Sequence, residues 1–153
     1  MSKKRFLLAV LGAFFLAAYR LGAQSAEFLD DLMFAEEATF GQASILVLMA
    51  NGIDEAGEDQ DLATQMVVRA DWIAGPKEPG MPVTLGDYSL MIMSAFQIPG
   101  GLGYRLFHSP RYAARELDYL GLVQGYASPR RILSGQDLLQ ILGSVMAWLE
   151  EHA

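Results

Sequence analysis

An internal match at an offset of fifty residues constrains this chain more than any other sequence feature. Sliding the sequence by fifty positions superposes residues 63–96 on residues 113–146 without a gap. Apolar residues fall on apolar residues at helical spacing, and glycine and proline in the loop fall on glycine and proline. Because a fixed period with matching punctuation is typical of repeated structural units, we expect tandem helix-loop-helix copies at about 61–99 and 107–149.

Helix caps mark where the second helix of each copy begins. Thr84 is followed three residues later by Asp87, and Ser134 by Asp137, which is the spacing of a capping box with a shortened acidic partner. Thr39 begins the same pattern, with a glutamine three residues further on. The apolar runs that follow predict buried helices, which for the two full copies lie at about 84–96 and 134–150.

The remaining pattern completes an all-α fold. A partial copy at 26–52 supplies an amphipathic helix at about 26–36 and then a buried one. The apolar run at 44–50 resembles a strand by composition, but its cap and an Asn-Gly stop favour a helix. With a short connector at 101–107, we expect about six helices in a single domain at 26–153, with three buried helices at its centre.

The first 25 residues are typical of a secretory signal peptide. Basic residues at 3–5 precede an apolar run at 6–18 and small residues at 22–26. The apolar run is shorter than the roughly 20 residues that span a bilayer. We therefore expect cleavage between residues 23 and 26 and export to the periplasm, the cell surface or the exterior, without stable membrane insertion of the mature chain. An uncleaved anchor and an ordinary first helix are the competing interpretations.

Charge and composition narrow the classes of partner. The chain has 153 residues, a formal net charge of −7 and no cysteine. Loss of the leader with its four basic residues leaves seven Lys and Arg against 18 Asp and Glu, which argues against nucleic-acid binding. The lack of cysteine excludes disulfides, thiolate metal sites and a cysteine nucleophile.

The cap, glycine and proline positions of the second copy resemble those of the S-layer homology domain. Its motif consists of FHSP at 107–110, where Ser109 is the expected cap, LGLVQGY at 120–126 and LSGQDL at 133–138; the first copy matches at 72–75 and 83–88. The resemblance covers about residues 61–149. It implies three such motifs in a pseudo-threefold helical arrangement, and it implies noncovalent attachment of an exported protein to cell-wall polysaccharide.

The chain departs from this family at the residue that follows each cap. The family has an arginine there, whereas this chain has Leu85 and Gly135 in the two full copies and Phe40 in the partial one. An arginine suits an anionic glycan because its guanidinium binds carboxylate oxygens in pairs. The resemblance therefore supports the architecture more than it supports polysaccharide attachment.

Basic residues concentrate in the second copy and suggest a ligand-binding surface. Arg111, Arg115, Arg130 and Arg131 lie there, and Tyr126 lies close to them in sequence. If they converge, with further tyrosines as stacking surfaces, they suit an acidic sugar. The alternative is that they neutralise the acidic part of the chain or simply remain solvated.

The other motifs do not complete a known metal-binding, phosphate-binding or catalytic pattern. The acidic segment 54–61 lacks the glycine and the final glutamate of an EF-hand, so we expect a solvated loop with Asp61 starting a helix. The glycine-rich segment 99–103 lacks the rest of a phosphate-binding motif and is interpreted as a hinge. Two histidines and no nucleophile motif predict neither catalysis nor a metal site, and we expect no cofactor.

These observations favour an exported, non-enzymatic module of the cell envelope. It would bind cell-wall polysaccharide or another envelope component through grooves between repeats. The alternative is a protein-interaction or structural subunit of the envelope that has lost glycan binding and self-associates. A periplasmic hydrolase is a third interpretation, which requires a carboxylate cluster in an accessible cleft.

Overall fold

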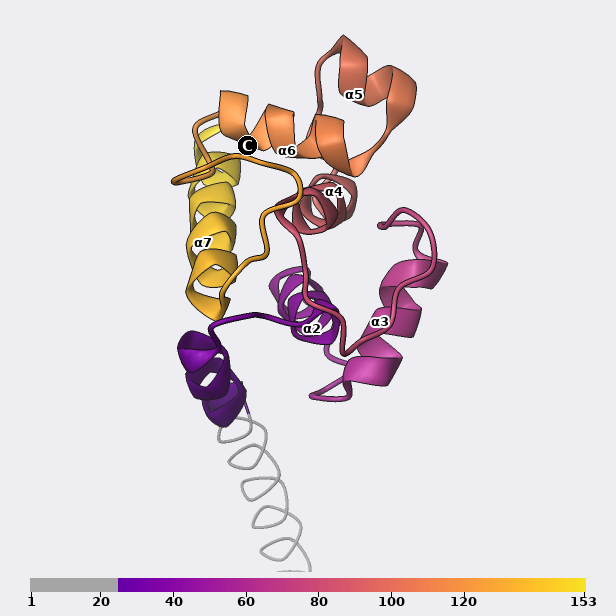
Figure 1. Ribbon diagram of the computed structural model, residues 1–153, viewed down its shortest axis with the longest axis vertical. Helices are drawn as coiled ribbons and strands as arrows, with labels where there is room; N and C mark the ends of the chain where they lie inside the picture. The colour runs from indigo at the N-terminus through magenta and orange to yellow at the C-terminus, as the bar shows by residue number, and fades with distance from the viewer. Residues whose placement is uncertain (1–24) are drawn as a thin grey trace, which may run out of the picture. The chain divides into compact units, whose positions relative to one another are not determined.

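The computed structural model describes residues 25–153, which form helices joined by loops, the two longest at 70–84 and 120–134 (Figure 1). The helices with defined bounds are α2 (Phe40–Ala50), α3 (Gln60–Arg69), α4 (Leu85–Ala95), α5 (Leu102–Phe107), α6 (Pro110–Tyr119) and α7 (Gly135–Glu151). Extended structure in the described residues is limited to two isolated antiparallel bridges, Thr39 with Pro82 and Thr84 with Ile132. The all-α prediction is confirmed, and the apolar run at 44–50 is helical.

The chain divides into two compact units, Met1–Asp31 and Leu32–Ala153. Residues 25–34 are helical, within the region where a helix was expected. The predicted signal peptide lies outside the described residues except for its last position, Ser25. From residue 25 onwards, no helix combines the length and the apolar character needed to cross a bilayer.

The three expected N-caps are present at the starts of α2, α4 and α7. The side chains of Thr39, Thr84 and Ser134 each accept the backbone N–H of the residue three positions on. The bond is reciprocal at Thr39 and Ser134, so these two are capping boxes. The reciprocal half predicted for Asp87 is wrong, because that carboxylate accepts from the Thr84 hydroxyl rather than from the Thr84 backbone.

A closed ring of backbone hydrogen bonds joins the segments that precede α2, α4 and α7. The N–H of Val83 donates to the carbonyl of Ala38 (2.9 Å), that of Leu133 to Val83 (3.0 Å), and that of Ala38 to Leu133 (2.8 Å). All three residues are fully buried, and each immediately precedes one of the N-caps. This backbone ring therefore fixes the starts of three helices around one point.

Neighbouring loops also pair the first N–H groups of these helices. The donor–acceptor pairs are Phe40 with Met81 (2.7 Å), Leu85 with Arg131 (2.8 Å) and Gly135 with Ala35 (2.9 Å) at the first helical residue, and Gly41 with Pro79 (2.8 Å) and Gly86 with Pro129 (2.9 Å) at the second. The first four N–H groups of a helix have no partner within it. Here carbonyls from the loop before another helix accept the first N–H groups of α2, α4 and α7. The side chain of the N-cap accepts the N–H of the third helical residue.

The helices pack in an order that differs from the order of the expected copies. Helix α3 packs against α2, α6 packs against α4, and α2 also contacts α4. The first helix of each expected copy thus lies on the second helix of the preceding one. Helix α4 meets α7 through Tyr88, which is fully buried and donates its hydroxyl to the carbonyl of Leu138 (2.9 Å).

The helices expected at the centre are not buried to the same extent. Helices α2 and α4 are buried over most of their length, because α3 and α6 cover them. Helix α7 buries one face through Leu138, Ile141, Leu142 and Val145, while Gln140 and Ala147 on the opposite side are exposed. The third helix therefore contributes a single apolar face to the core rather than its whole circumference.

Helices α3 and α6 end in the same left-handed turn. Asp71 and Gly121, fifty residues apart, have φ values of 59° and 73°. In each turn the following N–H bonds back to the carbonyl five residues earlier, at 3.1 Å and 2.9 Å, which is the Schellman pattern. The predicted correspondence between these two positions is present in the backbone.

Three local expectations need correction. Helix α3 is capped by Asp59, whose Oδ1 accepts the N–H of Leu62 (2.9 Å), so it starts before Asp61. Ser109 occupies the N-cap position of α6, but within the described structure its side chain makes no capping hydrogen bond. The connector at 101–107 is itself a short helix, α5.

Gly86 allows α4 to approach Pro110 and Pro129 closely, and substituting it tests how tight this approach is. A Cβ at this position would lie 2.9 Å from Pro110 Cβ and 3.0 Å from the Pro129 carbonyl oxygen. Gly86→Ala should lower the free energy of unfolding by about 1–2 kcal/mol, because overpacking outweighs the gain in helix propensity. Gly143→Ala in α7 is the control: a Cβ there has open space, so this change should raise stability by up to about 1 kcal/mol. Urea unfolding measures both, and equal effects would contradict the close approach.

Asp71 and Gly121 form a matched pair for backbone strain. Asp71→Gly should raise the free energy of unfolding by about 0.5–1 kcal/mol, since glycine adopts the left-handed conformation without a Cβ clash. Gly121→Ala should lower it by about 1 kcal/mol, because a side chain there meets open space and only the backbone is strained. Thermal unfolding of the two variants checks the signs; a loss of stability in Asp71→Gly would mean that its carboxylate stabilises the turn.

Candidate functional site

The five predicted ligand-binding residues lie in different settings. Arg111 and Arg115 are exposed on α6. Arg130 and Tyr126 are exposed in the loop before α7, Tyr126 by 78%. Arg131 is half-buried in the same loop. The structure therefore separates one inward-directed arginine from four residues that face solvent.

Arg131 holds its own loop in place. Its Nη1 donates to the carbonyl of Gln124 (3.1 Å), and its Nη2 lies 3.9 Å from Oδ1 of Asp137 in the first turn of α7. The Cβ of any residue replacing Gly125 would come within 2.9 Å of Nη1. The side chain retains 21% of its exposure; Nη1 is held by the loop carbonyl, while Nε and Nη2 are buried and have no hydrogen-bond partner among residues 25–153.

Arg115 lines a shallow pocket beside α6. The pocket has a volume of about 190 Å³ and is formed by Gly103, Tyr112, Arg115, Glu116 and Tyr119. The guanidinium carbon lies 6.0 Å from the centroid of the Tyr112 ring, at the limit of a cation–π contact. Tyr119 is 87% exposed at the rim. The pocket thus combines a free cation, an acceptor and two aromatic rings, the groups that recognise a polar ring such as a sugar.

The tyrosines that were expected to supply stacking surfaces play separate roles. Tyr112 and Tyr119 line the α6 pocket, whereas Tyr104 is the buried residue of α5. Burial raises the pKa of Tyr104, and a hydrogen bond with Ser94 acts in the opposite direction. Burial also raises the pKa of Tyr88. Both buried tyrosines therefore remain neutral and serve packing.

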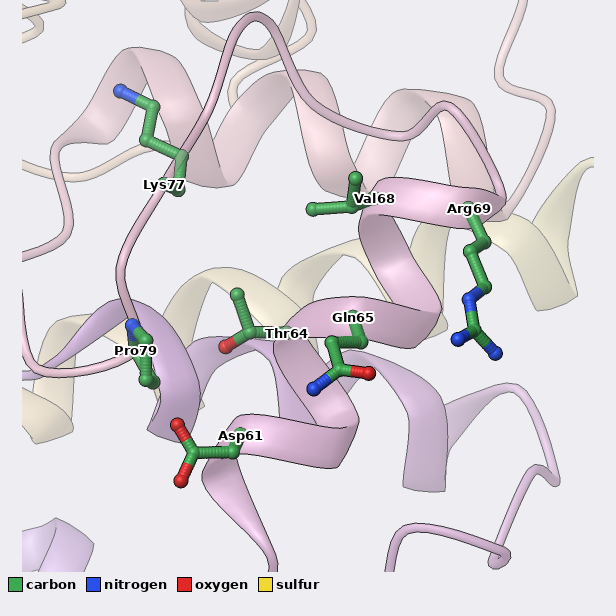
Figure 2. A pocket seen from close by; sticks show the side chains of 7 residues that line it. All are labelled: Asp61, Thr64, Gln65, Val68, Arg69, Lys77 and Pro79. Carbon is green, nitrogen blue, oxygen red and sulfur yellow. The ribbon is translucent and has the colours of Figure 1, made fainter.

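A second pocket lies between α3 and the loop that follows it. It has a volume of about 280 Å³ and is lined by Asp61, Thr64, Gln65, Val68, Arg69, Lys77 and Pro79. Figure 2 shows the first five side chains coming from α3 and the last two from the loop. The hydroxyl of Thr64 is buried and has no hydrogen-bond partner among residues 25–153. Charges of both signs line this pocket, so it does not select a ligand of one charge.

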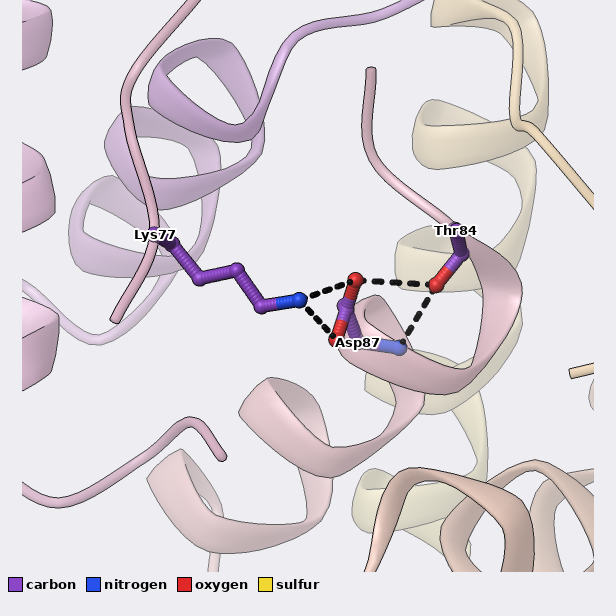
Figure 3. A network of polar contacts seen from close by, with 3 residues as sticks. All are labelled: Lys77, Thr84 and Asp87. Atoms are coloured by element: carbon purple, nitrogen blue, oxygen red, sulfur yellow. Dashed lines mark hydrogen bonds and ion pairs between the residues drawn. The ribbon is translucent and has the colours of Figure 1, made fainter. Parts of the chain in front are cut away.

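Lys77 at the edge of that pocket makes an internal ion pair (Figure 3). Its Nζ lies 3.1 Å from Oδ1 of Asp87 and donates to Oδ2 at 3.2 Å. The Thr84 hydroxyl donates to the same Oδ2 at 2.9 Å and accepts the backbone N–H of Asp87 at 3.2 Å. Asp87 is 8% exposed, so a loop cation is needed to offset the burial of its charge. Its carboxylate turns toward Lys77 and the hydroxyl, away from the Thr84 backbone.

The repeat pattern gave no signal for this ion pair. The position fifty residues after Lys77 is Ala127, and the second copy brings a cation to its cap carboxylate from Arg131 instead. The two copies thus meet the same electrostatic need from different loop positions. A sequence comparison that aligns residue with residue therefore misses it.

The arrangement of the side chains in residues 25–153 does not suggest a metal site. Across the described part of the chain, no group of three or more His, Asp or Glu residues is placed to hold a metal ion. The acidic segment 54–61 consists of a largely exposed loop at 54–59 and the first two residues of α3. The α6 pocket, with its exposed Arg115 and two tyrosines, is therefore the candidate site on which the proposal below is built.

Comparison of the chain with protein-family models, with curated proteins and with solved structures found no match.

Double-mutant cycles distinguish the two cap ion pairs. We expect Lys77→Met and Asp87→Asn to show a coupling of about 1–2 kcal/mol in the free energy of unfolding, because this pair is close and mostly buried. The matched cycle, Arg131→Met with Asp137→Asn, should show less than about 0.5 kcal/mol, since its charges are 3.9 Å apart and more exposed. Chemical unfolding of the four single and two double variants measures both couplings. A larger coupling at Arg131 would contradict the assignment.

Proposed function

We propose that this chain is an exported, non-enzymatic binding module of the cell envelope with an architecture similar to that of S-layer homology domains. Three features support the architecture: the fifty-residue offset, the matching left-handed turns after α3 and α6, and the backbone ring around which α2, α4 and α7 start. A cyclic exchange of hydrogen bonds among three equivalent positions suits a pseudo-threefold arrangement.

The positions where the family carries its ligand-binding arginine are engaged in packing here. Phe40 and Leu85 are buried, and their N–H groups donate to neighbouring loops. A side chain at Gly135 would run into the backbone carbonyl of Leu32. Any ligand contact in this chain must therefore use other residues.

The single observation that carries the proposed contact is the exposed Arg115 between Tyr112 and Tyr119. A guanidinium binds carboxylate oxygens in pairs, and tyrosine rings stack on the apolar faces of sugars. We propose that this pocket holds an acidic sugar unit of a cell-wall polymer. The ligand then contacts the Arg115 guanidinium and the tyrosine rings, while the Glu116 carboxylate of the same pocket is directed toward Gly101 and the rest of the polymer remains in solvent.

Sedimentation with purified, delipidated cell-wall polysaccharide tests this proposal. The double variant Arg115→Ser/Tyr119→Ser should weaken retention of the full chain about tenfold or more, since it removes the cation and the exposed ring. Arg130→Ser/Tyr126→Ser is the matched control, because it removes an exposed arginine and an exposed tyrosine that do not line the pocket. Arg131 stays unchanged in both, which keeps the loop intact. Equal retention of the two double variants would reject the α6 pocket.

The burial of Phe40 and Leu85 also favours a second function, that of a protein-interaction or structural subunit of the envelope. In that case the wild-type chain is not retained by polysaccharide at all. Sedimentation equilibrium over a range of protein concentrations then shows self-association. A strictly monomeric chain would count against the self-associating subunit.

A further inference from the structure

Helix α5 exposes an unusual amount of apolar surface for a helix of six residues. Leu102, Leu106 and Phe107 are 72%, 67% and 63% exposed. We call these three residues the α5 apolar face. In Figure 1, α5 lies on the outer side of α4 and α6, away from α2 and α7.

Neighbouring groups hold this face outward. Tyr104 is buried on the opposite side of α5, with 6% exposure, and its ring lies 4.9 Å from that of His108. The Phe107 ring stacks on Tyr112 of α6 at 5.2 Å with an interplanar angle of 14°. Tyr104 and Tyr112 hold the helix from two directions. The exposed apolar side chains therefore belong to a helix that is packed in place, not to a frayed end.

The surroundings of the α5 apolar face are basic in an otherwise acidic protein. No acidic residue occurs between Asp87 and Glu116 in the sequence, while three arginines do. Arg105 is exposed on α5 itself, and Arg115 lies over the ring on which Phe107 stacks. Glu116 and Asp118 follow on α6, and of these Glu116 is directed toward Gly101 at the start of α5. The charge beside the face is therefore mainly positive.

The size and the chemistry of this face fit a bilayer better than a folded protein. A stable protein interface buries about 800 Å² on each partner, far more than three side chains on six residues supply. Interfacial membrane binding needs only a helix whose apolar side chains enter the headgroup boundary and basic residues that are drawn to anionic lipids. From these residues we infer that α5 docks the protein on the surface of an anionic lipid bilayer, with Leu102, Leu106 and Phe107 inserted and Arg105 and Arg115 beside the headgroups.

This docking goes beyond polysaccharide binding and does not depend on it. The polymer is recognised in the α6 pocket through Tyr119, whereas the bilayer is contacted by α5. A chain that uses both surfaces would lie where the wall meets the membrane. Arg115 is shared by the two contacts, but Tyr119 is outside the α5 apolar face and Leu106 is outside the pocket, so changes at these two residues separate them.

A fluorophore placed on α5 tests the docking directly. The chain has no cysteine, so Leu106→Cys provides a unique attachment point for an environment-sensitive dye on the full-length protein. Vesicles of phosphatidylcholine and phosphatidylglycerol should shift the dye emission to the blue, and vesicles of phosphatidylcholine alone should not. Val68→Cys on α3, at a position 46% exposed, is the matched control and should show no shift. A local probe separates docking of α5 from any other contact that the chain makes with lipid.

Further variants test the charge and the apolar contribution. Arg105→Ser should weaken binding about fivefold, as expected for one basic residue at an anionic surface. Phe107→Ser should also reduce the shift, and raising the salt concentration should weaken binding. Circular dichroism identifies any variant that fails to fold. Because Arg105 is exposed, we expect Arg105→Ser to fold, and its binding then reports on the charge alone.

Two results would overturn the inference. One is the absence of a blue shift at residue 106 with anionic vesicles, or an equal shift at residue 68. The other is a shift produced by soluble polyglutamate without lipid, which would assign the α5 apolar face to an acidic protein instead.

Discussion

The backbone groups of three interior residues hold the starts of α2, α4 and α7 together. The N–H and C=O groups of Ala38, Val83 and Leu133 are removed from water, where an unpaired polar group is costly, and each finds its partner in the next member of the ring. Since each of these residues immediately precedes an N-cap, closing the ring also sets where three helices begin. Loss of one segment would leave unpaired groups on both of the others.

Loop cations complete the starts of α4 and α7. The cap carboxylates Asp87 and Asp137 are approached by Lys77 and Arg131, which reach them from loop positions that do not correspond. The requirement is for a positive charge near each carboxylate, not for a particular residue in the repeat. It explains why one of four candidate arginines belongs to the scaffold, and it moves the proposed ligand contact to α6.

Charged residues are unevenly distributed along the chain. Acidic residues dominate the sequence as a whole, yet the segment from residue 88 in α4 to residue 115 in α6 contains three arginines and no acids. That segment includes the α5 apolar face and most of the α6 pocket. The buried faces of α4 and α6 belong to the core together with the rest of the described chain, and the ring lies outside this segment. Scaffold and proposed contact surfaces are therefore built from different residues, so a contact can be altered with little effect on the packing.

Much of the fold was predictable, because its signals are local. The caps at Thr39 and Ser134 and the turn at Gly121 depend on hydrogen bonds within a few residues, so a short stretch of sequence determines them. The same holds for the all-α class, which follows from apolar spacing. What the tertiary structure decided are contacts between distant segments: the closure of the ring, α3 lying on α2, and Lys77 reaching Asp87. These depend on the paths that the loops take through space, and no local pattern in the sequence encodes such a path.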